Sequence, residues 1–458
     1  MYEQRAIPSV LSLIGNTPLV EITRLDTGPC QLFLKLESQN PGGSIKDRVA
    51  LSMIEDAERT GKLVAGSTIV EATAGNTGLG LALVAAAKKY RLVLVIPDKM
   101  SREKMMHLRA MGAEVHVTRT DVNKGHPDYY QDLAARLARE IPNALYIDQF
   151  NNPANPLAHE TSTAPELWEQ CGHRLDAIVC GVGSGGTLTG LGRFFRRAQP
   201  DLEMVLADPE GSVLAGYVRD KTIGKAGSWA VEGIGEDFIP GNADMSFVKE
   251  PITVSDSDSF HAARELLRQE GILGGSSTGT LLAAALRYCR RQTQPRRVLT
   301  FVCDSGSKYL SKMYDDNWML DQGFIHRPHE RGLRDLVTRR YHDGSVVTVS
   351  SDDTLLTAFN RMRTGDVSQL PVIDNEHVTG IVDESDLLSA IYQKTAHFSD
   401  PVRNAMTREV ETIGADENMQ KLLEMFDRGH VAVVMDRDDF IGLITRTDLL
   451  NFLRRSLS

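Results

Sequence analysis

Residues 40 to 48 read Asn40-Pro41-Gly42-Gly43-Ser44-Ile45-Lys46-Asp47-Arg48, which places a lysine directly after a Pro-Gly-Gly turn. The apolar spacing of residues 49–57 predicts a helix that is buried on one face, with Ser44 as its N-cap and Lys46 in its first turn. Because the positive end of a helix dipole disfavours an ammonium group, the amine there is easier to deprotonate. Lys46 is therefore a candidate Schiff-base nucleophile, with a solvated surface lysine as the ordinary alternative.

Two further segments place a glycine-rich loop between an apolar strand and a helix. The first, residues 71–78, lies between a strand pattern at 68–70 and a helical pattern at 79–87. The second, residues 181–187, lies between a strand pattern at 177–180 and a helical pattern at 188–195. Free N–H groups at a helix N-terminus bind anions, and glycines let the ligand approach the backbone closely. We therefore predict a carboxylate site in the first loop and a phosphate cradle in the second.

A dinucleotide-binding fingerprint is the competing interpretation of the second loop. Gly181, Gly183 and Gly186 match the spacing G-x-G-x-x-G. That fingerprint also needs an acidic residue at the end of a second strand about 20 residues later, and Asp208 is the nearest candidate. Its position does not meet the expected pattern, so the sequence favours the phosphate cradle.

Strand-like runs at residues 93–96, 114–118, 178–180, 204–207 and 298–302 alternate with helical patterns. Such alternation predicts an α/β fold with helices on both faces of a mainly parallel sheet. In open sheets of this kind ligands bind beyond the carboxyl ends of the strands, which is where the glycine-rich loops fall.

These segments together resemble the fold-type II pyridoxal-phosphate enzymes of the β-replacement group, the cysteine synthase and cystathionine β-synthase family. The resemblance extends from about residue 14 to residue 324 and includes Gly15-Asn16-Thr17-Pro18-Leu19, Asn152-Pro153-Ala154-Asn155-Pro156 and Gly274-Gly275-Ser276-Ser277-Thr278-Gly279. It implies two open, mainly parallel α/β subdomains and pyridoxal 5'-phosphate as the cofactor.

The resemblance also implies roles for individual residues. Lys46 would form the Schiff base and take the α-proton of the substrate, and Asn76 would bond to the ring hydroxyl. Ser277 would face the pyridine nitrogen, where a neutral hydroxyl favours β-elimination over transamination, and a helix N-cap is its alternative role. The remaining residues that the family assigns are the phosphate contacts Gly183, Ser184, Gly185, Gly186 and Thr187, and the substrate contacts Thr73, Ala74, Gly75, Thr77, Gln149 and Gly233.

The activity implied by the resemblance is the condensation of L-serine with L-homocysteine to L-cystathionine and water. Ala74, Phe150 and Glu236 stand where many relatives have Ser, Tyr and Tyr, so the choice between serine and O-acetylserine stays open. Two alternatives remain: a cysteine synthase that uses O-acetylserine and sulfide, and an adenylate-sensing protein without catalysis. Release of hydrogen sulfide is an expected side reaction. Glu232 resembles a residue implicated in proton handling, with a solvated loop carboxylate as its alternative role.

Composition narrows the class of protein further. The 458 residues include 51 lysines and arginines against 61 acidic residues, a formal charge of −10 that gives no general attraction for nucleic acid or anionic membranes. The five cysteines show no C-x-x-C spacing, which argues against a disulfide framework or a zinc site. We therefore expect a cytoplasmic protein without a bound metal. The N-terminus has neither a secretory signal nor room for a haem-binding extension, so no haem is expected.

Beyond residue 325, where the predicted catalytic domain 1–325 ends, the sequence changes character. Residues 326–343 form a predicted linker with one short helix at 333–338. Gly380-Ile381-Val382-Asp383-Glu384-Ser385-Asp386-Leu387-Leu388 then recurs as Gly442-Leu443-Ile444-Thr445-Arg446-Thr447-Asp448-Leu449-Leu450, an offset of 442 − 380 = 62 residues. We predict two regulatory repeats, 344–406 and 407–458.

The repeats resemble an α+β tandem Bateman module. The resemblance implies an adenosyl ligand, namely S-adenosylmethionine, AMP or ATP. We also expect the protein to be a homo-oligomer. Thr445 and Asp448 of the second copy would meet a ribose. Asp383 replaces the threonine in the first copy, and a carboxylate beside a phosphate is unfavourable, so we expect the second site to be the better one. A purely structural pair of repeats is the alternative.

Overall fold

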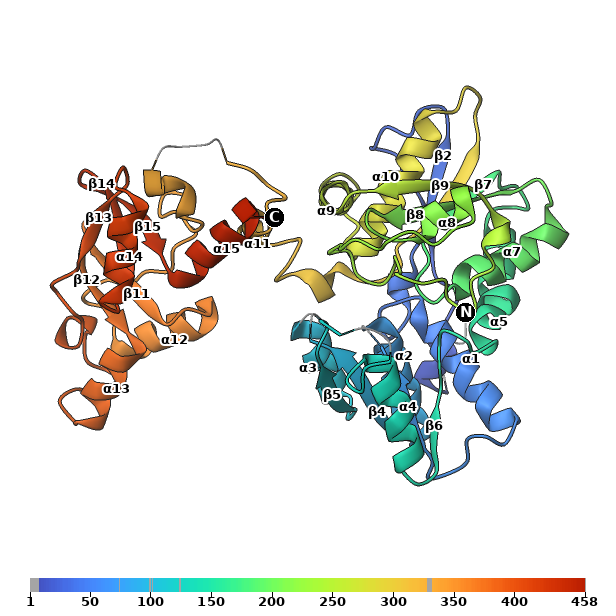
Figure 1. Cartoon of the computed structure of the whole chain (residues 1–458), viewed down its shortest axis with the longest axis horizontal. Helices are drawn as coiled ribbons and strands as arrows, with labels where there is room; N and C mark the ends of the chain where they lie inside the picture. Colours follow the sequence, from blue (N-terminus) through green and yellow to red (C-terminus); the bar gives the residue numbers. More distant parts are fainter. Residues whose placement is uncertain are drawn as a thin grey trace, which may run out of the picture. The chain divides into compact units, whose positions relative to one another are not determined.

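The computed structural model describes residues 8–73, 75–98, 100, 102–122, 125–327 and 332–457. The predicted substrate contact Ala74 therefore lies outside the described residues. The chain divides into two compact units, an N-terminal unit Met1–Tyr314 and a C-terminal unit Asp315–Ser458, each of which is described by itself. Figure 1 shows the elements of both units along the chain.

The larger sheet of the N-terminal unit has six strands in the order β1-β2-β10-β7-β8-β9. Only β1 runs antiparallel to its neighbour; the other pairs are parallel. The strands are β1 (Leu19–Glu21), β2 (Gln31–Lys35), β7 (Ala177–Cys180), β8 (Glu203–Pro209), β9 (Val248–Val254) and β10 (Arg297–Phe301). The helices that accompany them are α6 (Ala164–Gln170), α7 (Gly186–Ala198), α8 (Leu214–Asp220), α9 (Asp256–Glu270) and α10 (Ser276–Arg290). Strand β7 is wholly buried, as expected of a parallel strand covered on both faces.

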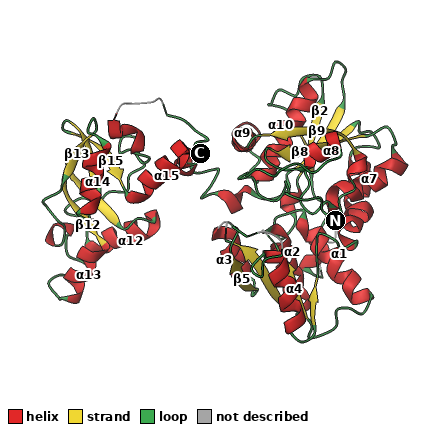
Figure 2. Cartoon of the chain, in the orientation of Figure 1, coloured by secondary structure: helices red, strands yellow, loops and turns green. Residues whose placement is uncertain are grey.

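The smaller sheet has four parallel strands in the order β5-β4-β3-β6. They are β3 (Thr68–Ala72), β4 (Arg91–Pro97), β5 (Glu114–Thr118) and β6 (Ala144–Tyr146). The helices here are α1 (Lys46–Arg59), α2 (Asn76–Lys88), α3 (Arg102–Ala110), α4 (Tyr130–Glu140) and α5 (Ala154–Ala158). Helices α1 and α2 approach closely at Gly80, which has no side chain. A Cβ on Gly80 would lie 2.8 Å from the carbonyl oxygen of Lys46. Figure 2 shows strands flanked by helices in this unit, and the predicted α/β class is confirmed.

The C-terminal unit contains both copies of the repeat. The first copy comprises α12 (Leu355–Gly365), β11 (Gln369–Asp374), β12 (His377–Asp383) and α13 (Glu384–Tyr392). The second comprises β13 (Thr412–Gly414), α14 (Met419–Asp427), β14 (Ala432–Asp436), β15 (Asp439–Ile444) and α15 (Arg446–Leu457), and α11 (Asp316–Asp321) precedes both copies. The strand pairs β11–β12 and β14–β15 are antiparallel, and each register shifts at the equivalent position, after Val372 and after Val434. The shared irregularity supports the predicted internal repeat.

The predicted linker 326–343 is structured over part of its length. Residues Gly332–Leu336 form a 3-10 helix, where an ordinary short helix was predicted for 333–338. Leu333 and Val337 are buried in one core with residues of the second repeat, and the Leu333 amide donates to the carbonyl of Ala415 at 2.7 Å. Their apolar side chains explain the difference, since a free linker would leave them in water.

Two predicted N-caps are wrong. The N-cap of α1 is Ile45, and Ser44 instead accepts a hydrogen bond from the Lys46 amide at 3.2 Å. Ser44 also pairs through its backbone with Asp304, which fixes it one residue too early to cap the helix. The N-cap of α10 is Gly275, and Ser277 is the second residue of that helix.

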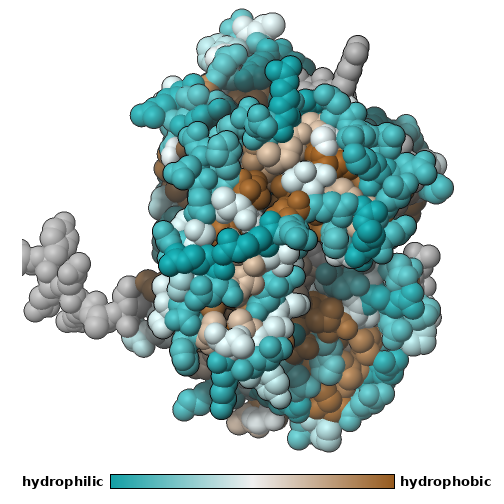
Figure 3. Space-filling model, turned by 90° about the vertical axis from the view of Figure 1, so that its left-hand side faces the viewer, coloured by the Kyte–Doolittle hydropathy of each residue, from teal (hydrophilic) through white to brown (hydrophobic). Residues whose placement is uncertain are grey.

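Figure 3 shows one side of the surface, where hydrophilic residues predominate and apolar residues gather in separate patches. Within the described residues, no helix combines the length and the apolar character that a bilayer crossing requires.

Candidate active site

Lys46 is the first residue of α1, and its amine lies in a desolvated environment. Burial lowers the pKa of Lys46, while the nearby groups of Cys303, Asp304 and Glu236 raise it to a smaller extent. The net shift favours the neutral amine, which is the nucleophilic form of lysine.

The turn before Lys46 is held from both sides. The Gly42 amide donates to Asp47 Oδ2 at 2.5 Å, and a Cβ on Gly42 would collide with that carboxylate. The Lys308 ammonium donates to the carbonyls of Gly42 at 3.2 Å and Gly43 at 3.1 Å. Burial raises the pKa of Asp47 to about 6. The paired glycines are needed here because side chains and a cation pack directly on the turn.

The phosphate loop, residues 183–187, follows β7 and opens α7. Gly185 is the N-cap of α7, with φ +84, and a Cβ there would lie 2.6 Å from the backbone of Ala243. Among the described residues, none accepts a hydrogen bond from the backbone amides of Ser184 to Thr187. These amides stand at the positive end of a 13-residue helix. The loop therefore has the donors that a phosphate group requires.

Neutral side chains support the phosphate loop. Asn155 donates to the Ser184 hydroxyl at 2.9 Å, and a Cβ on Gly186 would collide with the same asparagine. Thr187 Oγ1 lies 3.2 Å from His159 Nε2. Burial holds the pKa of His159 well below its usual range, so the imidazole is neutral.

The substrate loop, residues 73–77, follows β3 and opens α2. Thr73 accepts a hydrogen bond from the Gly75 amide at 3.1 Å. The Thr77 hydroxyl donates to Gln149 Oε1 at 2.6 Å, and Gln149 in turn donates to the Ala72 carbonyl at 3.1 Å. The structure thus brings Gln149 to the predicted substrate contacts Thr73, Gly75 and Thr77, which lie 72 or more residues before it in the sequence.

The side-chain amide of Asn76 has a defined orientation. Its Nδ2 donates to Asp304 Oδ2 at 2.7 Å, and its Oδ1 accepts from the Lys308 ammonium at 2.9 Å. Since a carboxylate only accepts and an ammonium only donates, the two ends of the amide cannot be exchanged. Among the described residues, Asp304 is the acceptor for Nδ2, and the second N–H of that group can serve a further acceptor.

Ser277 and Gly233 also lie near these groups. Ser277 is buried, and its side chain lowers the pKa of the Cys303 thiol, an effect smaller than that of burial. Burial raises the pKa of Cys303 to about 12, so the thiol stays protonated beside Lys46. The carbonyl of Gly233 packs on the phosphate loop, because a Cβ on Gly183 would lie 2.5 Å from it.

The structure adds several residues to the site that the sequence did not single out: Lys104 from α3, and Asp304, Lys308 and Tyr309 from the segment after β10. They follow no local motif, and only the fold brings them to Asn76. The interpretation of Glu232 as a solvated carboxylate is wrong. Its side chain is 16% exposed and accepts hydrogen bonds from Lys104 at 2.6 Å and Lys312 at 2.7 Å.

In the C-terminal unit, Thr445 and Asp448 lie together. The Thr445 hydroxyl donates to Asp448 Oδ2 at 2.6 Å, and its amide donates to the same oxygen at 2.7 Å. Asp383 and Asp386 form the equivalent capping box in the first repeat. The two copies therefore differ in one charge at matching positions.

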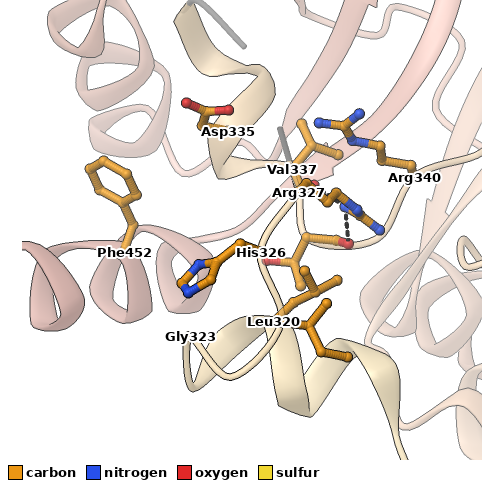
Figure 4. A pocket seen from close by; sticks show the side chains of 10 residues that line it. Leu320, Gly323, His326, Arg327, Asp335, Val337, Arg340 and Phe452 are labelled. Carbon is orange, nitrogen blue, oxygen red and sulfur yellow. Dashed lines mark hydrogen bonds between the residues drawn. The ribbon is translucent and has the colours of Figure 1, made fainter. Parts of the chain in front are cut away.

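A separate cavity of about 280 Å³ lies in the C-terminal unit. Figure 4 shows its lining, with Phe452, Asp335, His326 and Arg327 around it. Arg327 donates to the carbonyls of Val337 at 3.1 Å and Thr338 at 2.8 Å. Thr445 and Asp448 are not among its lining residues, so the cavity is distinct from the predicted nucleoside contacts.

Comparison with known proteins places the chain in a family. The model described as pyridoxal-phosphate dependent enzyme matches residues 10–304, and the CBS domain model matches residues 333–393 and 402–455. The chain belongs to the pyridoxal-phosphate dependent enzymes. It is 36% identical to "Cystathionine beta-synthase" of Dictyostelium discoideum, over 98% of this chain and 92% of that protein, and it belongs to the same family.

Two solved structures support the same placement. A hydrogen sulfide-producing enzyme from Fusobacterium nucleatum is 37% identical, with a TM-score of 0.63 over 67% of this chain and 100% of that one. An O-acetylserine dependent cystathionine beta-synthase from Helicobacter pylori is 36% identical, with a TM-score of 0.62 over 68% of this chain and 99% of that one. The fold-type II interpretation of the sequence is confirmed.

Proposed function

We propose that this enzyme condenses L-serine with L-homocysteine to form L-cystathionine and water, with pyridoxal 5'-phosphate bound at Lys46. The observation that carries the proposal is Lys46 at the start of α1, directly after a turn held by Asp47 and Lys308, with its neutral amine favoured by burial, which lowers its pKa. Full-length similarity to proteins named cystathionine beta-synthase supports the choice of reaction.

The residues present fit the cofactor. The amides of residues 184–187 and the hydroxyls of Ser184 and Thr187 would hold the phosphate, and Gly183, Gly185 and Gly186 leave the room it needs. Asn76 would donate to the ring oxygen, and the neutral hydroxyl of Ser277 would face the ring nitrogen. When bound, pyridoxal phosphate supplies an electron sink for negative charge at the substrate α-carbon.

Lys46 moves the proton in this proposal. A neutral amine can take the proton from the α-carbon of serine, whose β-hydroxyl then leaves and takes up the thiol proton of homocysteine to form water. The thiol sulfur bonds to the β-carbon, and Lys46 returns its proton to the α-carbon. The substrate loop holds the substrate carboxylate through Thr73, Gly75 and Thr77, and Gln149 fixes Thr77. Ala74 and Gly233 complete the proposed substrate contacts.

The leaving group depends on the first substrate, and it is hydroxide from serine or acetate from O-acetylserine. The similarity to an O-acetylserine dependent enzyme favours O-acetylserine as a second candidate for the first substrate. Phe150, one of the three positions where the sequence departs from the pattern of the family it resembles, is buried against Phe238 with ring centroids 5.6 Å apart. Release of hydrogen sulfide is a proposed side activity, supported by the similarity to a hydrogen sulfide-producing enzyme.

Two earlier alternatives are not favoured. A cysteine synthase would not account for similarity that continues through the C-terminal repeats. A sensor without catalysis predicts damage at the proposed cofactor contacts, whereas Lys46, Asn76 and Ser277 are all present.

For the C-terminal unit we propose an adenosyl ligand at Thr445 and Asp448. The CBS domain matches and the paired hydroxyl and carboxylate support this assignment. We further propose a homo-oligomeric, cytoplasmic enzyme, a location supported by five cysteines that are all free thiols.

The test offers the purified protein four pairings, serine or O-acetylserine with homocysteine or sulfide, and identifies the products by mass spectrometry. Cystathionine from serine supports the proposal, and cystathionine from O-acetylserine alone selects the second candidate. Cysteine as the only product, made from O-acetylserine and sulfide, contradicts both. Repeating the assay with S-adenosylmethionine, AMP and ATP tests the C-terminal ligand.

A further inference from the structure

Buried side chains form a continuous chain of hydrogen bonds behind Asn76. Lys104 donates to Glu232 Oε2 at 2.6 Å and to the hydroxyl of Tyr309 at 2.9 Å. The Tyr309 hydroxyl donates to Asp304 Oδ2 at 2.8 Å, and Asn76 donates to the same oxygen at 2.7 Å. The chain therefore runs from an ion pair at Glu232 to the side chain proposed to contact the cofactor ring.

The direction of each hydrogen bond is fixed by chemistry. An ammonium group only donates, so Tyr309 accepts from Lys104 and uses its own proton to donate to Asp304. Burial, reinforced by the nearby Asp304 carboxylate, raises the pKa of Tyr309 well above its usual range, so the phenol keeps that proton. The charge of Lys104 thus acts on Asp304 through one polarised hydroxyl.

Burial makes these charges effective. Lys104 is 2% exposed, Tyr309 1% and Asp304 0%, so little water screens them. The Lys104 ammonium also lies 4.4 Å from the centre of the Tyr309 ring, and its side chain packs on Gly75 of the substrate loop. Asp304 is close enough to Lys46 to oppose the lowering of its pKa. The network therefore lies within electrostatic range of both Lys46 and Asn76.

We propose that Lys104, Tyr309 and Asp304 are positioning residues that set how a proton is shared between the ring oxygen of bound pyridoxal phosphate and the nitrogen that joins it to Lys46. The inference rests on the proposed function, since Asn76 meets the ring only if the cofactor binds at Lys46. Lys104 and Tyr309 compensate the Asp304 carboxylate. Without them, its negative charge disfavours a negative ring oxygen, and the proton moves from the nitrogen to that oxygen.

The test is Tyr309→Phe, which removes only the hydroxyl that links Lys104 to Asp304. Tyr288→Phe is a matched control, because Tyr288 is 1% exposed and its hydroxyl also accepts from a cation, Arg296, and donates to a carboxylate, Glu203. Each protein is loaded with pyridoxal phosphate, and its absorption spectrum is recorded at one pH. Borohydride reduction and mass spectrometry then establish that the cofactor is attached to Lys46.

We expect the ratio of the long-wavelength to the short-wavelength cofactor band to fall roughly fivefold in Tyr309→Phe, the effect of losing one hydrogen bond. The ratio should stay at the wild-type value in Tyr288→Phe. Lys104→Met should also lower the ratio. If Tyr309→Phe does not fold, the ratio measured in Lys104→Met tests the inference in its place. Wild-type ratios in both Tyr309→Phe and Lys104→Met overturn the inference while leaving the cofactor site intact. A wild-type protein that gains no cofactor band overturns the proposed function and the inference together.

Discussion

The phosphate loop and the substrate loop follow the same plan, since each links a buried parallel strand to a helix, but their surroundings differ. The phosphate loop packs closely on backbone groups and neutral side chains, including Ala243, Gly233 and the neutral His159. The Glu236 carboxylate lies farther out, 4.0 Å from the position that a Cβ on Gly183 would take. The substrate loop is bordered by ionisable groups, Glu71 before it and Lys104 packed on Gly75. Backbone geometry is enough to hold a phosphate that stays bound, whereas a site that binds and releases an amino acid is surrounded by charges that respond to it.

The largest effect is expected from a substitution that disturbs the backbone of the phosphate loop. Gly185→Ala puts a Cβ 2.6 Å from the backbone of Ala243 at φ +84, so neither the space nor the conformation accepts it. Overpacking and strain together amount to about 4 kcal/mol, close to a thousandfold loss of cofactor affinity. Titration with pyridoxal phosphate, followed by absorbance, measures the loss.

Gly112→Ala is the matched control for that substitution. Gly112 has φ +85, and nothing lies within 4 Å of the position its Cβ would take. It should cost about 1 kcal/mol of stability from strain alone and leave cofactor affinity unchanged. Equal losses of affinity in the two variants would contradict the role assigned to close packing at Gly185.

The next largest effect is expected at an ionisable group beside the substrate loop. Glu71 is the second-last residue of β3, the strand that leads into the substrate loop. Burial raises its pKa from 4.5 to about 8, although hydrogen bonds from the Gln149 and Ala72 amides lower it. The folded state therefore binds the proton more tightly than the unfolded state. This contribution to stability is complete below about pH 4.5 and is lost as the pH rises through about 8.

We expect the ionisation of Glu71 alone to lower the free energy of unfolding by about 4 kcal/mol between about pH 5 and pH 9, and this part of the fall should be absent in Glu71→Gln. Urea unfolding across this pH range provides the measurement. Asp47 and Asp208, whose pKa values burial raises to about 6, add a similar loss at lower pH in both proteins. A pH profile that is unchanged in Glu71→Gln would show that Glu71 is ionised in the folded protein.

A glycine-to-alanine substitution in the substrate loop should have a smaller effect than Gly185→Ala in the phosphate loop. Gly75→Ala places a Cβ 2.9 Å from Cδ of Lys104 at φ +149. A flexible side chain can move away where a backbone cannot, so strain of about 1–2 kcal/mol remains and KM for the first substrate should rise about tenfold. Steady-state kinetics with serine test this expectation, and cofactor affinity should stay within the wild-type range. A loss of cofactor comparable to that in Gly185→Ala would remove the distinction between the loops.

The smallest effect is expected at a side chain of the phosphate loop. Ser184→Ala removes one hydroxyl, while the backbone amides remain and Asn155 keeps its hydrogen bond to the Gln149 carbonyl at 2.8 Å. Cofactor affinity should fall only about fivefold, the effect of one hydrogen bond. The exposed Ser246, mutated to alanine, provides the control. A loss near a thousandfold in Ser184→Ala would mean that side chains, and not the backbone, carry the phosphate site.

The sequence could predict those parts of the site whose residues belong to short local motifs. A lysine after a Pro-Gly-Gly turn and two strand-loop-helix segments could be located because glycine and apolar spacing act over a few residues. Lys104, Tyr309 and Asp304 have no such pattern, since α3 and the segment after β10 meet only in the folded chain. The buried Leu333 carried a usable signal, because an apolar residue within a predicted linker indicates packing.

The attachment of pyridoxal phosphate to Lys46 underlies every role proposed above, and covalent labelling tests this attachment directly. The protein is loaded with pyridoxal phosphate, reduced with borohydride and digested, and the modified peptide is identified by mass spectrometry. We predict one pyridoxyl group per chain, on Lys46, and no label at that site in Lys46→Ala. Label on Lys104 or Lys308, or label spread over exposed lysines while Lys46 stays unmodified, would contradict this prediction.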